Sequence, residues 1–192
     1  MLKDLILKCR SYRRFHEDVA VSMETLRDLV DLARCTASAT NRQPLKYILS
    51  CSRERNAQIF SCLHWAALLK TWQGPTDGER PAAYIIVLGD KDVVPSFGVD
   101  HGIAAQTILL GAVEKGLGGC MLAAVDRDDL KIFLSIPAKM DVLLVIAIGK
   151  PREKIVIDVL EPGGSTNYWR DKDDMHHVPK RRLDDIIIAH YE

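Results

Sequence analysis

The sequence has no surplus of charge of either sign and contains few aromatic residues. Lysine plus arginine number 26, aspartate plus glutamate also number 26, and the formal net charge is zero. Sequence-independent binding to nucleic acid needs a basic surplus that displaces counterions, so this balance argues against that class of function. Aromatic residues make up only 6% of the chain, too few for a platform that stacks single-stranded bases.

No hydrophobic run is long enough to span a bilayer. The longest mostly apolar stretch covers residues 142–149, whereas a spanning helix needs ~20 apolar residues. An acid, Asp4, interrupts the N-terminal stretch, which argues against a signal peptide. Nothing in the charge pattern indicates an anionic membrane surface as a partner either. We therefore expect no membrane association.

The five cysteines are odd in number and include no C-x-x-C pair. This pattern is typical of free thiols in a reducing compartment, so it favours a cytoplasmic protein without disulfides.

Signatures of metal, nucleotide-loop and serine-hydrolase chemistry are missing. The six histidines form no H-x-x-x-H pair, and no His–Cys cluster has zinc-finger spacing, so no metal site is expected. The chain also lacks G-x-G-x-x-G, G-x-x-x-x-G-K-[ST] and G-x-S-x-G. These absences argue against Rossmann and Walker cofactor sites and against a nucleophile elbow.

What the sequence does contain is enough apolar residue, 47% of 192, to build a core in one domain over residues 1–192. Patterning predicts helices over 1–9, 23–35, 54–70, 99–115 and 126–134. It predicts strands over 46–51, 82–88, 120–123, 141–149, 155–159 and 183–188. The order does not fit simple βαβ winding, so the predicted class is α+β, with a central mixed sheet wrapped by helices.

Two of these elements predict contact with a second subunit. The helix over 99–115 is apolar nearly all round, which predicts burial on all sides, and a subunit interface is a natural place for it. The tail carries three consecutive isoleucines at 186–188. We interpret it as a strand added to a sheet edge, with a partner subunit's sheet as the expected place.

Small polar and basic side chains gather in three segments. Arg10, Ser11 and Arg13 can hold a phosphate, because arginine binds one through forked, charge-assisted hydrogen bonds. Lys180 and Arg182 form a second basic cluster that can converge on the same phosphate. Alternatively, these basic residues bind no ligand and only form a solvent-exposed surface. The polar loop over 37–44 either lines a ligand or is a plain connection.

Five segments, in order, resemble motifs of the nitroreductase family of FMN enzymes. They are Arg10-Ser11-x-Arg13-x-Phe15, Ala37-Ser38-Ala39-x-Asn41-x-Gln43-Pro44, the run from Gly102 through Gly116-Leu117-Gly118-Gly119, Gly149-Lys150-Pro151, and Pro179-Lys180-x-Arg182-Leu183. The resemblance implies a homodimer that holds FMN in two sites at the interface. It also implies turnover in which NAD(P)H reduces the flavin and a small-molecule acceptor, such as a nitroaromatic or a quinone, oxidises it.

The resemblance also assigns the cofactor-binding residues. The phosphate and ribityl chain would be held by Arg10, Ser11, Arg13, Lys180 and Arg182. The flavin pocket would be lined by Asn41 and Gln43, with Ser38 and Ala39 reaching across from the other subunit. The isoalloxazine would lie along Met121, Leu122, Ala123 and Ala124, with a backbone N–H meeting N5 or O4. No general acid or base is implied, because hydride transfer is the cofactor's own chemistry.

Three alternatives stay open at this stage. One is a flavin carrier or sensor without turnover. Another is a specialised relative, such as a reductive dehalogenase, which would need a lid, or a flavin-destroying enzyme; residues 74–80 are a short lid candidate. The third is a phosphate-ligand protein that uses no flavin.

Overall fold

The computed structural model describes all 192 residues, and they form two compact units. The main unit comprises Met1–Trp65 and Gly74–Arg152, and the small unit comprises Ala66–Gln73 and Glu153–Glu192. Compact units of one chain can fold together or separately. The single domain over residues 1–192 therefore stays a prediction.

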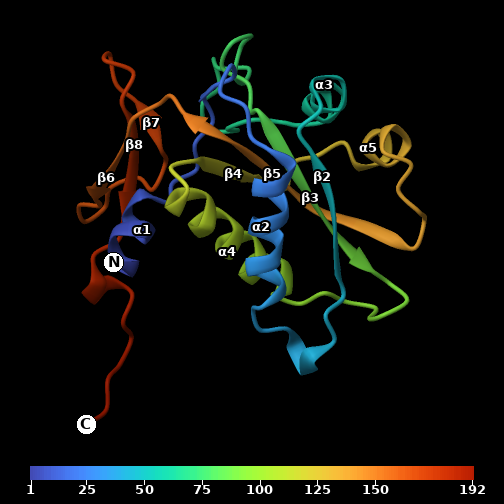
Figure 1. Cartoon of the computed structure of the whole chain (residues 1–192). Coiled ribbons are helices and arrows are strands. Elements are labelled where there is room, and N and C mark those ends of the chain that lie inside the picture. The colour runs from blue at the N-terminus through green and yellow to red at the C-terminus, as the bar shows by residue number, and fades with distance from the viewer. The chain divides into compact units, whose positions relative to one another are not determined.

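A five-stranded sheet forms the centre of the main unit (Figure 1). Its strands are β1 (Phe15–His16), β2 (Leu45–Ser50), β3 (Ala83–Asp90), β4 (Gly118–Leu122) and β5 (Met140–Pro151). They run in the order β1-β5-β3-β2, and β4 also pairs with β5. These strand pairs are antiparallel, and an isolated parallel bridge joins Ser11 to Gly119. With helices packed around the sheet, the predicted α+β class is confirmed.

Five α-helices accompany this sheet: α1 (Leu2–Lys8), α2 (Met23–Arg34), α3 (Arg53–Ser61), α4 (Asp100–Glu114) and α5 (Arg127–Phe133). Ser22 caps α2, because its side chain accepts a hydrogen bond from the Thr25 N–H at 3.0 Å. The helix predicted over 54–70 is too long. It ends at Ser61, and the chain then pairs Leu63 with Val125 in an isolated bridge. None of the helices has the length and apolar character that crossing a bilayer requires.

The core of the main unit lies between α2, α4 and one face of the sheet (Figure 1). Leu26 and Leu29 of α2, Ile108 of α4 and Ile85 of β3 are each fully buried. Gly111 permits the close approach of α2 and α4, because a Cβ there would lie 2.7 Å from a methyl carbon of Leu32. Gly111 therefore serves the packing of α4 on α2 within the chain.

The outer face of α4 is not covered within the chain. Gly102, Ile103 and Gln106 are exposed, while Ile108 on the inner face is fully buried. The predicted burial on all sides is therefore wrong for the chain alone. The sheet and α2 cover only one side of the helix, and its cover by a second subunit stays a prediction.

The small unit contains a three-stranded sheet of β6 (Ile155–Val159), β7 (Trp169–Arg170) and β8 (His176–Lys180). β8 pairs with β6 in parallel and with β7 in antiparallel orientation. The predicted strand over 183–188 does not form: Leu183–Asp185 is a 3-10 helix, and Ile188 beyond it is 96% exposed. The tail pairs with no strand of its own chain, although β2, β6 and β7 are edge strands. Pairing with a partner's sheet stays a prediction.

Candidate functional site

The basic segment of residues 10–13 lies against the beginning of β4. Ser11 forms the parallel bridge to Gly119, and the Tyr12 N–H donates to the Gly119 carbonyl oxygen at 3.0 Å. The Arg10 Nη2 donates to the Ile6 carbonyl oxygen at 2.7 Å, and its Nε is buried without a hydrogen-bond partner. The Arg13 Nη1 donates to the Ser11 carbonyl oxygen at 3.2 Å. Three of the predicted phosphate ligands thus share one short backbone stretch that the sheet holds in place.

The glycines after α4 allow this approach. A Cβ on Gly118 would lie 2.5 Å from the Tyr12 ring, and one on Gly119 would collide with the Ala147 carbonyl oxygen. Gly116, with φ of +72°, makes the turn out of α4. The G-L-G sequence therefore ends a helix and also admits the segment of residues 10–13.

The remaining residues of the first motif are structural. Phe15 is fully buried, and its N–H donates to the Glu79 carbonyl oxygen at 2.9 Å. The Arg14 guanidinium lies 3.4 Å from the Glu79 carboxylate. Burial raises the pKa of the Cys9 thiol, which argues against a thiolate at this position near neutral pH. Contacts of Glu79 also tie down the segment 74–80, which is the short lid candidate.

The polar loop of residues 38–43 is held by a buried carboxylate. The Ser38 Oγ donates to Asp100 Oδ2 at 2.6 Å, and the Ala39 N–H donates to Asp100 Oδ1 at 3.2 Å. The Ser38 Oγ also accepts from the Gln43 N–H at 2.9 Å. Asp100 is only 4% exposed and lies in the first turn of α4. The Ser38 hydroxyl thus links Asp100 to the Gln43 backbone and stabilises the conformation of the loop.

The same loop has an unusual backbone. Thr40, Asn41 and Gln43 have φ values of 49°, 55° and 51°, which lie in the left-handed region. The Gln43 Nε2 donates to the Asn41 Oδ1 at 3.1 Å, so the two predicted pocket residues are in contact. Each left-handed residue other than glycine costs of order 1–3 kcal/mol and persists where its surroundings impose it. The contacts of Asp100 are such a constraint.

Asp100 was not among the residues singled out from the sequence. Its partner Ser38 is 62 positions away, so no local spacing connects them. The available signal was an acid at the start of an otherwise apolar helix, which by itself indicates only a favourable helix-dipole position.

The two sets of predicted ligands lie at opposite ends of α4 within one chain. Loop 38–43 contacts Asp100 at the beginning of α4, whereas residues 11 and 12 contact Gly119 beyond its end. α4 has 15 residues and is therefore about 22 Å long. Figure 1 shows the 39–41 turn at the far end of α4 from β4. One chain does not bring the two sets together.

The end of β4 is shorter than predicted. Met121 and Leu122 belong to the strand, but Ala123 and Ala124 follow it and are exposed. The Ala123 carbonyl oxygen accepts from Arg127 Nη2 at 3.0 Å, and that of Ala124 accepts from the His64 N–H at 3.1 Å. Both carbonyl oxygens thus have protein donors, and the flavin contact through a backbone N–H stays a prediction.

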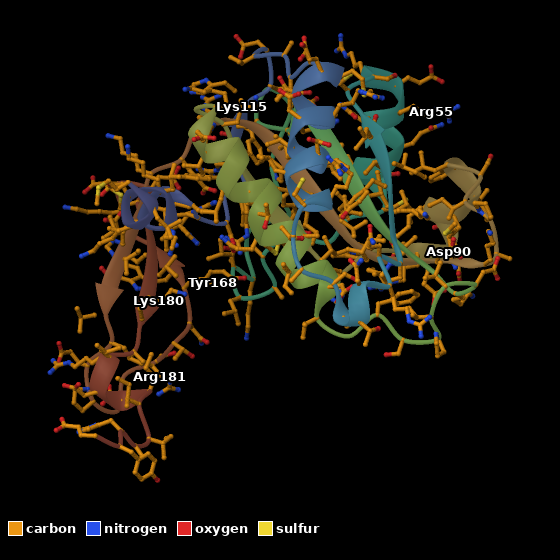
Figure 2. The ribbon with its side chains drawn as sticks, turned by 60° about the horizontal axis from the view of Figure 1, so that its bottom comes forward. Arg55, Asp90, Lys115, Tyr168, Lys180 and Arg181 are labelled. Carbon is orange, nitrogen blue, oxygen red and sulfur yellow. The ribbon has the colours of Figure 1, made fainter.

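The second basic cluster belongs to the small unit. Lys180 ends β8 and is exposed (Figure 2), while the Arg182 Nη2 contacts Glu161 Oε2 at 2.8 Å. The Arg182 and Glu161 side chains are 52% and 71% exposed. An exposed ion pair contributes only about 0–1 kcal/mol, so Arg182 can exchange this partner for another anion. Convergence of the two basic clusters stays a prediction.

Known proteins resemble this chain in sequence. The model of the Nitroreductase family matches residues 6–150, which is more than half of the chain. The chain belongs to the nitroreductase family. A protein of Methanothermobacter thermautotrophicus named "Putative NADH dehydrogenase/NAD(P)H nitroreductase" is 29% identical over 153 residues, 77% of this chain and 76% of that relative. A protein of Archaeoglobus fulgidus with the same name is 25% identical and covers 73% of this chain and 80% of its own.

Solved structures of nitroreductase family proteins have the same fold. A nitroreductase family protein of Streptococcus pneumoniae superposes with a TM-score of 0.71 at 19% identity, over 99% of this chain and 100% of that chain. An FMN-dependent nitroreductase of Clostridium difficile gives a TM-score of 0.65 at 24% identity, over 78% and 87% of the two chains. The family predicted from five short motifs is therefore confirmed.

Proposed function

We propose that this protein is an FMN-dependent oxidoreductase in which NAD(P)H reduces the flavin and a small acceptor oxidises it. The archaeal relatives are named for NADH dehydrogenase and NAD(P)H nitroreductase activity, and one structural neighbour is an FMN-dependent nitroreductase. The alternating half-reactions and the class of acceptor follow from the family resemblance.

The unpaired side-chain nitrogen of Arg10 gives the strongest support for this proposal. Its Nε is buried without a partner, beside Ser11 and Arg13 in a backbone stretch that the sheet fixes. A buried donor without an acceptor costs about 1–3 kcal/mol, and a phosphate oxygen is an acceptor that arginine binds well. The residues present therefore fit the phosphate of FMN.

A second copy of the chain completes the site in this proposal. Asn41 and Gln43 lie at the other end of α4 from the phosphate ligands, so they would serve the flavin whose phosphate is held by the partner. The exposed outer face of α4, with Gly102 and Ile103, would lie in that interface. We thus propose a homodimer with two composite sites.

When bound, FMN supplies the hydride and electron chemistry of both half-reactions. The chain's residues position it: Arg10, Ser11 and Arg13 hold the phosphate end, and an N–H of Ala123 or Ala124 meets the ring. The loop held by Asp100 presents Asn41 and Gln43. This division of labour requires no side chain as general acid or base.

Anaerobic mixing with a pyridine nucleotide tests the function. We expect a yellow protein whose flavin absorbance bleaches rapidly with NADH or NADPH and returns when quinone is added. A bound flavin that neither NADH nor NADPH bleaches rapidly would favour a carrier or sensor without turnover. A colourless protein that takes up no added FMN would favour a phosphate-ligand protein without flavin.

The phosphate site has its own test. Arg13→Ala should lower FMN affinity by about 1.5–3 kcal/mol, roughly ten- to a hundred-fold, because a charge-assisted hydrogen bond is lost. Arg27→Ala is the matched control, since Arg27 is exposed on α2 and is not a predicted ligand. Fluorescence quenching of FMN measures both affinities. Equal affinity in the two variants would remove Arg13 from the site.

A further inference from the structure

A cavity of about 740 Å³ lies in the main unit, away from the predicted flavin ligands. Its walls include Asn56 and Phe60 of α3, Tyr84 of β3, Arg80 and Glu17. Ala83 and Ile85, on either side of Tyr84, belong to the core beneath α2 and α4. Because side chains alternate along a strand, Tyr84 lies on the opposite face of the sheet. None of the residues predicted to bind FMN lines this cavity.

Tyr84 places an unused donor in this wall. Its side chain is 1% exposed, and its hydroxyl has no hydrogen-bond partner. Burial raises the pKa of Tyr84 well above its ordinary value, so the hydroxyl stays protonated and available to donate. A buried hydroxyl without a partner is costly to keep.

Arg80 contributes a second unused donor. Its guanidinium carbon lies 4.5 Å from the centre of the Phe60 ring, and its Nη2 contacts Asp77 Oδ1 at 2.8 Å. Its Nε is buried without a partner. Backbone contacts fix the segment, because the N–H groups of Gly78 and Arg80 donate to Glu17 Oε2 at 2.6 and 3.3 Å. The Tyr84 hydroxyl and the Arg80 Nε are thus two donors of the lining residues that lack acceptors.

The acids of the cavity do not supply those acceptors. Glu17 Oε2 already receives two backbone N–H groups, the Asp77 side chain is 90% exposed, and Asp18 is exposed. Arg53 is the second cation of the lining. The cavity therefore presents donors in its wall, a flat surface where the Arg80 guanidinium lies over the Phe60 ring, and carboxylates that discourage a multiply charged anion.

We propose that this cavity is a binding site for a small planar carboxylate, with its oxygens on the Tyr84 hydroxyl and the Arg80 Nε and its flat body on the Phe60 side. A single carboxylate matches two donors, whereas a phosphate dianion would face Glu17 and Asp77 with twice the charge. A volume of about 740 Å³ falls within the usual range for small-molecule sites, roughly 300–1,000 Å³. The site does not depend on the bound flavin.

Benzoate is the probe, measured by calorimetry and thermal shift on the purified full-length protein in excess FMN. We expect saturable binding that Tyr84→Phe weakens about ten-fold, without lowering the melting temperature of the benzoate-free protein. A hydroxyl that makes no hydrogen bond in the unliganded chain contributes nothing there when it is removed. Arg80→Met should abolish binding, with circular dichroism to verify its fold.

Tyr47→Phe is the matched control, because Tyr47 lies on the neighbouring strand β2 and lines a different cavity. Unchanged benzoate affinity in this variant supports the proposal. Three results would overturn it: no saturable benzoate binding, equal affinity in wild type and Tyr84→Phe, or inorganic phosphate that competes as well as benzoate. A lower melting temperature of benzoate-free Tyr84→Phe would also count against it, because the hydroxyl would then have a structural partner.

Discussion

At the scale of single residues, Asp100 is the buried carboxylate that holds the polar loop of the candidate site. Its two carboxylate oxygens accept from the Ser38 hydroxyl and the Ala39 N–H. The position in the first turn of α4 adds a favourable interaction with the helix dipole. At 4% exposure these donors replace the water that would otherwise solvate the side chain. We therefore regard Asp100 as the residue that keeps loop 38–43 in its left-handed conformation.

Asp100→Asn tests this role. The amide keeps one acceptor but loses the charge, so we expect a loss of about 1.5–3 kcal/mol in the free energy of unfolding, measured in urea without FMN. Ser38→Ala should cost clearly less in the Asp100→Asn background than in wild type, because the two side chains share one hydrogen bond. Strictly additive losses in this double-mutant cycle would contradict the assignment.

At the scale of elements, His177 connects β8 of the small unit to its two neighbouring strands. The His177 Nδ1 lies 2.9 Å from Asp158 Oδ2 on β6, and its Nε2 lies 3.4 Å from Asp171 Oδ2. The Trp169 ring of β7 stacks on the imidazole, with centroids 4.2 Å apart and an interplanar angle of 9°. One imidazole thus links all three strands of this sheet.

This arrangement predicts a pH dependence. Burial alone would lower the pKa of His177, but the hydrogen bonds to Asp158 and Asp171 outweigh it and raise the pKa above its ordinary value. A raised pKa in the folded state stabilises the sheet fully below the unfolded pKa of about 6.5. That stabilisation is lost as pH rises through the folded pKa.

The thermal stability of the small unit should therefore fall as pH rises from about 6 through the pKa of His177. Tryptophan fluorescence gives a local signal, because the imidazolium quenches the stacked Trp169. His177→Gln should remove both the fluorescence titration and this part of the stability change. His190→Gln is the control, since His190 lies in the exposed tail. A titration that survives in His177→Gln would assign it to another group.

Element by element, the sequence predicted what local patterns determine. β3 is apolar over residues 83–88 and buried at every position, and α2 lies where its patterning predicted a helix. The shape of loop 38–43 escaped prediction because it depends on Asp100, far away in the chain. The tail strand failed because three isoleucines indicate a need for cover but do not provide a sheet edge.

The site residues show the same limit. The motif Arg10-Ser11-x-Arg13 marked a segment that the structure holds against β4, but spacing did not show that Arg14 would pair with Glu79. Ser38 matched a family motif, yet its hydroxyl is engaged with Asp100. The motifs predicted which segments form the site, and that prediction stays open. The contacts within each segment, such as those of Arg14 and Ser38, depend on distant residues and were visible only in the fold.

At the scale of the whole molecule, the length of α4 predicts a composite site. A chain carrying Arg13→Ala and a chain carrying Asn41→Ala should each bind FMN weakly as homodimers. Co-expressed with two different tags, they should form a heterodimer with one doubly altered site and one unaltered site. We expect one tightly bound FMN per purified heterodimer, measured by flavin absorbance against protein concentration.

The alternative outcome is equally clear. If each site lay within one chain, both sites of the heterodimer would carry one substitution, and no tight FMN would be bound. Sedimentation of the wild-type protein as a monomer that retains FMN would also contradict the composite site. The matched control is a heterodimer in which both substitutions are in the same chain, because it should hold two half-altered sites and no tight FMN.

The last prediction asks whether Lys180 and Arg182 of the small unit bind the FMN phosphate. β8 ends at Lys180; if the chain stays extended through Arg182, Lys180 and Arg182 point to the same side and Arg181 to the other. If they bind the phosphate, Lys180→Ala combined with Arg182→Ala should weaken FMN binding by at least ten-fold, about 1.4 kcal/mol. Arg181→Ala removes one adjacent positive charge and should leave the affinity nearly unchanged.

Melting temperatures in excess FMN should separate lost binding from lost packing. The double variant should keep the fold, because Lys180 is exposed and the pair of Arg182 with Glu161 is a weak surface contact. Equal, small losses in Arg181→Ala and in the double variant would show a general effect of positive charge. The phosphate would then be held by the main unit alone, through Arg10, Ser11 and Arg13.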